Sequence, residues 1–299
     1  MGGGAWTTSA SVDFVNTKYH AYASTATATS LDALLTLDTA QVYDSVKLDP
    51  LLDPKGVIRE CRDSDEHPET FPIILALDVT GSMGKATKMC AAKLNDIMEE
   101  LYGKVKDIEF LMMGIGDLSY DRAPIQATQF ESDVRILDQT TKIYFEGGGG
   151  GNSFESYTAA WYFGLHNTDI DCWKRGKKGV IITLGDEPLN PYLPGEALYK
   201  VLDGNRQSIM KDIDTDELYR EALEKFNIYH IAITDRECSY RSYADKIENS
   251  WGKLLGQRCM YGTSEDLPKL IGQIVDDSLN DNSFTMKSSI KVGEEGVSW

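Results

Sequence analysis

A run of five apolar residues, Ile73 to Leu77, constrains the fold of this chain more than any other stretch. Pro72 precedes the run, and glycines follow it soon afterwards at Gly81 and Gly84. A short apolar run bounded in this way is typical of a strand that is buried on both faces of a sheet. Because such strands belong to parallel sheets covered by helices, the run predicts an α/β protein.

Further apolar runs repeat this pattern, and segments with helical spacing of apolar residues separate them. The additional strands that we expect are Ile108–Gly114, Gly179–Leu184 and Ile228–Thr234, with Gln126–Phe130 and Arg258–Tyr261 as short outer strands. Strands that alternate with helices form a mostly parallel sheet with helices on both faces. The sequence therefore predicts a doubly wound α/β fold with a mostly parallel central sheet.

The chain divides into three parts by composition. Residues 1–70 lack a sustained period and are predicted to form an N-terminal extension, which is either an ordered arm draped over the main domain or a partly disordered tail; its aromatic residues favour an arm that docks. Residues 71–280 form the predicted domain, with an insertion at about 188–205 that is marked by Pro191 and Pro194. Residues 281–299 are predicted to be a polar C-terminal tail.

Charge and cysteine content exclude several classes of function. The net charge of −17 argues against sequence-independent nucleic-acid binding and against anionic membrane surfaces, so neither partner is expected. No apolar run approaches the length that crosses a bilayer, and the N-terminus lacks the features of a secretory signal. The five cysteines show no Cys-x-x-Cys pair, which favours reduced thiols in a cytoplasmic protein.

Oxygen-bearing side chains follow the predicted strands where the strands end. Asp78, Thr80 and Ser82 come directly after the first buried strand, and Asp186 follows the strand at 179–184. Ser153 follows a run of glycines that precedes a helix. In open α/β sheets, ligands bind at the carboxyl ends of the strands, where these loops would converge. One or two carboxylates with several hydroxyls form a hard-oxygen set, which suits Mg²⁺, Mn²⁺ or Ca²⁺.

Three of these segments resemble the metal-ion-dependent adhesion site (MIDAS) of von Willebrand factor type A (vWA) domains. The stretch from Asp78 to Ser82 is similar to the family pattern Asp-x-Ser/Thr-x-Ser, and 151–155 is similar to a Gly-Asp-Thr-Pro-Glu loop. Asp186-Glu-Pro resembles the Asp-x-Pro of the same subgroup, although Asp186 lies two residues later than the commoner position. The resemblance covers about 71–280 and implies a metal site with the ligands Asp78, Thr80, Ser82, Ser153 and Asp186.

The resemblance also implies a function, because the metal of such domains recruits an acidic residue of another protein. The expected protein is a recognition module and not an enzyme, with Mg²⁺ (or Mn²⁺/Ca²⁺) as its cofactor. Intracellular bacterial members are often adaptors for MoxR-type AAA+ ATPases, and the sequence also looks like uncharacterised bacterial and phage vWA proteins. A structural component of a phage particle, in contact with virion proteins, is therefore an alternative to a cytoplasmic adaptor.

Other interpretations of the Asp78 loop compete with an adhesion site. Small polar residues also cap ordinary strand-to-helix turns. Asp-x-Thr-Gly-Ser is close to the phosphorylated loop of haloacid dehalogenase-like phosphohydrolases, in which Asp78 would be the nucleophile. That chemistry needs a lysine near the aspartate, whereas Lys177 and Lys178 precede their strand and so lie at its wrong end. A serine-hydrolase elbow is excluded because Thr80 stands where its first glycine is required.

Overall fold

The computed structural model describes Tyr43 and residues 45–102, 104–133, 135–147, 152, 154–202 and 211–284. Most of the predicted N-terminal extension, the region after Phe284 and the predicted ligand Ser153 lie outside the described residues.

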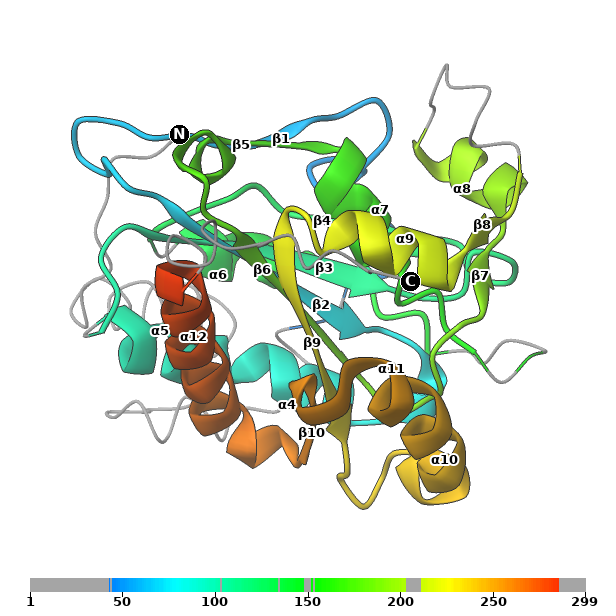
Figure 1. Cartoon of the computed structure of the whole chain (residues 1–299). Coiled ribbons are helices and arrows are strands. Elements are labelled where there is room, and N and C mark those ends of the chain that lie inside the picture. The colour runs from blue at the N-terminus through cyan, green and yellow to red at the C-terminus, as the bar shows by residue number, and fades with distance from the viewer. Residues whose placement is uncertain are drawn as a thin grey trace, which may run out of the picture.

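Six strands form the central sheet, in the order β10-β9-β6-β2-β3-β4 (Figure 1). All neighbouring strands are parallel except β3 and the outer strand β4, which pair antiparallel. The strands are β2 (Phe71–Asp78), β3 (Ile108–Ile115), β4 (Ile125–Ala127), β6 (Gly179–Gly185), β9 (Phe226–Ile233) and β10 (Cys259–Gly262). The predicted fold class, a doubly wound and mostly parallel α/β sheet, is confirmed.

The chain reverses its direction of travel across the sheet once. From the central strand β2 it proceeds outward to β3 and β4, and then it returns to β6 on the other side of β2 and continues to β9 and β10. This is a common doubly wound order, and its switch point lies between β2 and β6. Asp78 ends β2 and Asp186 directly follows β6, so both residues flank the switch point.

Alternate residues of β2 face two separate hydrophobic layers. Ile73, Leu75 and Leu77 pack with buried residues of one helical layer. The helices that contribute to this layer are α4 (Ala86–Ala92), α5 (Leu94–Tyr102), α6 (Arg135–Thr140) and α12 (Leu267–Phe284). In Figure 1, α5 and α12 lie to the left of the sheet.

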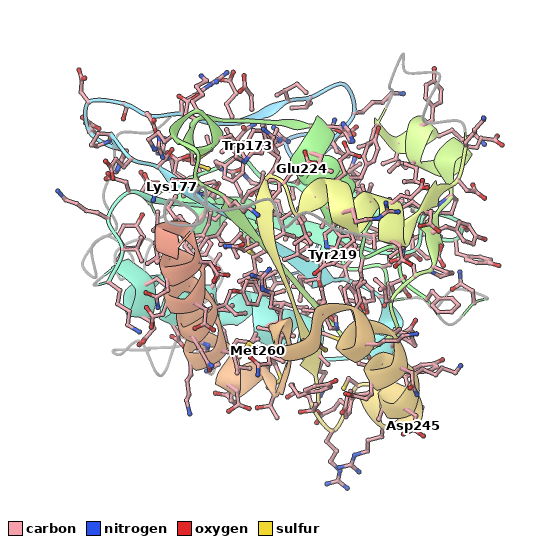
Figure 2. The ribbon with its side chains drawn as sticks, in the orientation of Figure 1. Trp173, Lys177, Tyr219, Glu224, Asp245 and Met260 are labelled. Atoms are coloured by element: carbon pink, nitrogen blue, oxygen red, sulfur yellow. The ribbon has the colours of Figure 1, made fainter. Side chains whose placement is uncertain are left out.

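The opposite face of β2, with Ile74 and Ala76, packs against the second layer. Its helices are α7 (Ala159–His166), α8 (Gly195–Leu202), α9 (Thr215–Ala222), α10 (Tyr240–Ile247) and α11 (Lys253–Leu255). Tyr219 of α9, labelled in Figure 2, packs on Trp161 of α7 with ring centroids 5.5 Å apart. The period-two alternation of β2 thus places a helical layer on each face.

Two element boundaries differ from the sequence-based prediction. After Gly84 the apolar residues keep helical spacing from Ala86 to Leu101, which predicts one helix, but a turn at Lys93 divides this segment into α4 and α5. The amine of Lys93 forms ion pairs with Asp96 and Glu265. Helix α12 continues to Phe284, so residues 281–284, which were assigned to the tail, are helical. An ion pair from Arg258 to Asp281 at 2.6 Å holds its last turns. None of the described helices combines the length and the apolar character that a membrane span requires.

The described part of the N-terminal extension lies against the main domain. Strand β1 (Arg59–Cys61) pairs in parallel with β5 (Thr168–Ile170) in a separate two-stranded sheet. The Arg59 side chain is buried, and its Nη2 donates hydrogen bonds to the carbonyls of Leu51 and Ala127, both at 2.8 Å. One guanidinium therefore joins the extension to the outer strand β4. Strand β7 (Tyr192–Leu193) lies in the predicted insertion. It pairs antiparallel with β8 (Ile213–Asp214), which follows the insertion in the sequence.

We predict that Arg59→Met destabilises the fold by about 2–4 kcal/mol, because the substitution removes the donor from the buried carbonyl of Ala127 and from the partly buried carbonyl of Leu51. Urea denaturation of the full chain measures this loss. Arg236→Met is the matched control, since Arg236 is exposed on the loop after β9. Equal stability of the two variants would show that the extension is not held by Arg59.

Candidate functional site

The site begins with a carboxylate that is completely buried at the carboxyl end of β2. Asp78 has no exposed surface, and its Oδ1 accepts hydrogen bonds from the Thr80 amide at 2.9 Å and the Thr80 hydroxyl at 2.6 Å. The turn after β2 is held to β3 by a hydrogen bond from the Val79 amide to the carbonyl of Ile115. Because Thr80 is only two residues after Asp78, the two hydrogen bonds between them are local contacts.

Hydroxyl groups continue the network from the first loop to the loop after β6. The hydroxyls of Thr80 and Ser82 are 3.1 Å apart, and Ser82 donates to Asp186 Oδ1 at 2.9 Å. The other oxygen of Asp186 accepts from the amide of Ser239, which precedes α10. Four of the five predicted site residues therefore meet at the switch point of the sheet. Asp186 reaches Ser82 despite its later position in the sequence.

Tyr157 is a member of the site that the sequence did not reveal. Its hydroxyl donates to Asp78 Oδ2 at 2.6 Å and accepts from the Glu187 amide at 3.3 Å. Gly185 makes this contact possible, because a Cβ atom there would collide with the Tyr157 hydroxyl. In the sequence Tyr157 has helical spacing with Ala160, Trp161 and Leu165, which is typical of a packing residue, and no pattern distinguishes a tyrosine that packs from one that also donates.

Aromatic side chains form the floor beneath Tyr157. The ring of Trp251 lies 5.8 Å from Tyr157 and stacks on His230 at 4.0 Å, with the two planes nearly parallel. The hydroxyl of Thr183 lies 2.9 Å from His230 Nδ1. Complete burial lowers the pKa of His230 to about 3, so the ring is neutral and supplies no positive charge.

Two further carboxylates lie at the same edge of the sheet, and both lack a complete set of partners. Glu155 and Glu187 are buried, and the Oε2 atom of each has no hydrogen-bond partner among the described residues. Burial, followed by repulsion from Asp78, raises the pKa of Glu155 to about 11 and that of Glu187 to about 8. Burial and then Asp186 raise the pKa of Asp78 to about 7. The region is therefore short of positive charge.

The loop after β3 brings Asp117 to this edge as well. Asp117 accepts from the amide of Ser119 at 2.6 Å and from the side-chain amide of Asn152 at 2.6 Å. Asn152 belongs to 151–155, the segment that is similar to a Gly-Asp-Thr-Pro-Glu loop. The hydrogen bond therefore holds that segment beside the end of β3. Ser153, the neighbouring predicted ligand, lies outside the described residues.

The chemistry of the site fits a hard divalent cation. Within the described residues, no group of three or more His, Cys, Asp and Glu side chains is arranged to hold a metal by itself. The candidate set consists instead of two carboxylates, Asp78 and Asp186, with the hydroxyls of Thr80 and Ser82. Carboxylate and neutral oxygens are the ligands that Mg²⁺ and Ca²⁺ accept. A cation nearby would also favour ionisation of Glu155 and Glu187, whose Oε2 atoms have no hydrogen-bond partner among the described residues.

Comparison with known proteins supports no assignment by itself. No family model and no curated protein matches the sequence. The pilus adhesin SpaC from Lactobacillus rhamnosus GG matches at 10% identity with a TM-score of 0.46, over 76% of this chain and 31% of the adhesin. BatB from Bacteroides thetaiotaomicron matches at 13% identity and 0.42, over 70% of this chain and 99% of BatB. An aerotolerance-related membrane protein from Bacteroides fragilis NCTC 9343 matches at 13% identity and 0.40, over 71% and 99%.

These likenesses leave the function open. The match spans less than a third of the SpaC adhesin, and the TM-scores are all below 0.5. The fold class of this chain is therefore assigned from its own strand order and register. The candidate site depends on the hydrogen bonds between Asp78, Thr80, Ser82 and Asp186.

We predict that the protein loses stability between pH 5 and pH 8 when divalent ions are removed with EDTA. The folded state raises the pKa of Asp78, Glu187 and Glu155 above the value of about 4 that unfolded carboxyls have. Between the unfolded and the folded pKa values, the folded chain binds more protons than the unfolded chain. The free energy of unfolding therefore falls as the pH rises through this range.

Thermal melting in EDTA across this pH range measures the effect. Glu155→Gln should reduce the decline, because it removes one carboxyl whose pKa differs between the folded and unfolded states. Glu69→Gln, on an exposed part of the chain, should leave the decline unchanged. A decline that is the same in both variants would show that the buried carboxylates are not its source.

Proposed function

We propose that this protein is a divalent-metal-dependent protein–protein interaction module. The observation that carries the proposal is the continuous hydrogen-bonded set of Asp78, Thr80, Ser82 and Asp186 at the switch point of the sheet. The switch point is where doubly wound sheets bind their ligands. The resemblance of three loops to the adhesion site of vWA domains agrees with this position.

The residues that would hold the ion are Asp78, Thr80, Ser82 and Asp186, with Ser153 as a further ligand. Each hydroxyl oxygen has lone pairs that can turn from a neighbouring residue to a cation. Mg²⁺ is the proposed ion, with Mn²⁺ or Ca²⁺ as alternatives. Because hydroxyls are neutral, a site with two carboxylates leaves the ion electron-poor, and it can accept a further oxygen ligand.

An acidic side chain of another protein is the proposed partner group for that ion. The chain carries a net charge of −17, so long-range electrostatics oppose an acidic partner. The attraction must therefore be local to the metal. In a cytoplasmic setting the partner would be a component of a multiprotein assembly, for example a MoxR-type AAA+ ATPase. The alternative is a structural role in a phage particle, with virion proteins as partners.

The surroundings of Asp78 favour a binding role over a phosphohydrolase. A nucleophilic aspartate needs an accessible oxygen, whereas Asp78 is completely buried and both of its oxygens accept hydrogen bonds. Among the described residues, no lysine or arginine donates a hydrogen bond to it. Lys178 lies at the start of β6 and donates to the carbonyl of Leu223, at the opposite end of the strand from Asp186.

We predict that millimolar Mg²⁺ or Mn²⁺ raises the melting temperature of the protein. An ion that binds only the folded state stabilises it by about 2.7 kcal/mol at a concentration of 100 times its Kd. For a domain of this size, that gain corresponds to a rise of roughly 5–10 °C. Ser82→Ala and Asp186→Asn should reduce the rise, and Ser242→Ala, an exposed serine of α10, should retain it.

A wild-type protein that does not respond to either ion would exclude the metal site. An equal response in Ser82→Ala and Ser242→Ala would place the ion elsewhere. Magnesium-dependent hydrolysis of an aryl phosphate that disappears in Asp78→Asn would support the phosphohydrolase instead.

We predict that capture of a native partner depends on the metal and not on long-range charge. EDTA should abolish the capture, and Thr80→Ala should weaken it without preventing folding. Raising the salt concentration should leave the association unchanged or strengthen it, because charges beyond about 10 Å are screened at 0.1 M salt. Affinity that is indifferent to both EDTA and Thr80→Ala would contradict an adhesion-type mechanism.

A further inference from the structure

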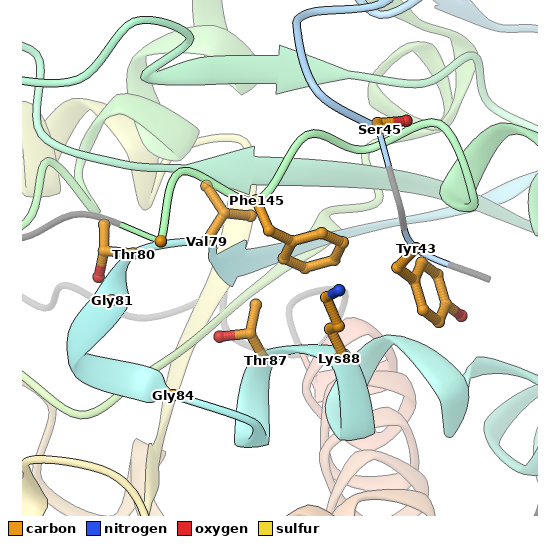
Figure 3. Close-up of a pocket in the computed structure, with 10 residues that line it drawn as sticks. Tyr43, Ser45, Val79, Thr80, Gly81, Gly84, Thr87, Lys88 and Phe145 are labelled. Atoms are coloured by element: carbon orange, nitrogen blue, oxygen red, sulfur yellow. The ribbon is translucent and has the colours of Figure 1, made fainter. Parts of the chain in front are cut away.

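A separate pocket opens beside the Asp78 loop, on the side of helix α4 (Figure 3). Its volume is about 370 Å³. Thr87 and Lys88 extend into it from α4, and Val79 and Phe145 extend into it from the opposite wall. The hydroxyl of Thr87 points toward the side of the pocket where Thr80 lies.

The Thr87 hydroxyl is buried without a hydrogen-bond partner among the described residues. The residue is 2% exposed, and its Oγ1 neither donates nor accepts within the described part of the chain. A threonine in a helix often satisfies its hydroxyl with the carbonyl one turn earlier. Leaving a buried hydroxyl unsatisfied costs about 1–3 kcal/mol, so an unpartnered group that lines a pocket indicates an incoming acceptor.

Lys88 supplies a positive charge to the same pocket. It is half-buried, and no carboxylate of the described residues lies within ion-pair distance of its amine. Its Nζ instead lies over the ring of Phe145, 5.7 Å from the centroid. Acidic residues outnumber basic ones by 47 to 30 in this chain, so a half-buried lysine without a carboxylate partner is an unusual feature.

The remaining wall of the pocket is apolar and aromatic. Phe145 packs edge-on against Tyr43, with ring centroids 5.7 Å apart. Val79 adds an aliphatic surface between Phe145 and the Thr80 side of the pocket. The pocket therefore combines one amine and the hydroxyl-bearing residues Ser45, Thr80 and Thr87 with apolar and aromatic side chains, which is a usual composition of a small-molecule site.

We propose that this pocket binds an organic carboxylate whose apolar part lies against Phe145. A carboxylate has one charge and two oxygens, which one ammonium and one hydroxyl can satisfy together. A phosphate group carries more charge than the single ammonium of Lys88 can offset. The pocket adjoins the proposed metal site, because Thr80 lines it, but the binding of a carboxylate beside Lys88 and Thr87 does not require a metal.

The test uses the full chain in EDTA with 3-phenylpropionate as the probe and calorimetry as the measurement. The probe should bind saturably at millimolar concentration, and the uncharged 3-phenylpropionamide should bind at least tenfold more weakly. Lys88→Gln should weaken the probe by about tenfold, which is the loss expected for a charge-assisted hydrogen bond. Lys246→Gln is the matched control, because Lys246 lies over the ring of Tyr243 at 5.2 Å without lining this pocket.

Thr87→Val separates binding from folding. The variant removes an unsatisfied hydroxyl and keeps the shape of the side chain, so it should melt at or above the wild-type temperature and still bind the probe about fivefold more weakly. N-acetyl-Ala-Phe and its amide distinguish the source of the carboxylate. Tighter binding than 3-phenylpropionate indicates the terminus of a protein chain, and weaker binding indicates a free small molecule.

Four results would overturn the proposal. They are no saturable binding of 3-phenylpropionate, equal binding of its amide, equal loss in Lys88→Gln and Lys246→Gln, or displacement of the probe by equimolar inorganic phosphate. Because all of these measurements are made in EDTA, their outcome is independent of the response to Mg²⁺ that tests the proposed function.

Discussion

The burial of Asp78 is the constraint on which the rest of the site depends. A carboxylate without contact with water must have its oxygens satisfied from within the protein. Asp78 accepts hydrogen bonds from the hydroxyl and the amide of Thr80, and from the hydroxyl of Tyr157 in the layer that contains α7. These contacts link the end of β2 to the turn that follows it and to the segment before α7, so the geometry of the loops follows from one buried charge.

The parallel arrangement of strands then concentrates further negative charge at the same edge. Asp117, Glu155, Asp186 and Glu187 come from loops that all lie at the carboxyl ends of the strands or beside them. Burial, and then their mutual repulsion, raises the pKa values of the buried glutamates, and His230 does not offset the repulsion because it is neutral. Such an edge can be stabilised by protons or by a cation, and the proposed divalent ion would act in the second way.

Charge is distributed differently on the two sides of the Asp78 loop. On the side of Glu155 and Glu187 the loop faces carboxylates, and on the side of α4 it faces Lys88 and the hydroxyl of Thr87. A single turn of the backbone separates these environments. The proposed cation and the proposed organic carboxylate would therefore lie on opposite sides of this loop, with Thr80 between them.

Much of the fold could be predicted from the sequence because the signals are local. The mostly apolar runs of β2, β6 and β9 identify buried parallel strands, and the spacing of oxygen-bearing residues after Leu77 identifies the loop that contains Asp78, Thr80 and Ser82. The break at Lys93 could not be predicted, because the apolar face continues from α4 into α5 and the ion pair to Glu265 depends on the distant start of α12.

The amino-acid sequence by itself determined the fold class and four residues of the candidate site, since strand periodicity and loop composition are properties of short segments. Only the tertiary structure decided which distant groups meet. Tyr157 has the spacing of a core residue, yet its hydroxyl reaches Asp78 across 79 positions, and Gly185 leaves the space for it. The pairing of Ser82 with Asp186 across 104 positions likewise depends on the register of β2 and β6. Such contacts arise from the packing of the layers, which no local pattern encodes.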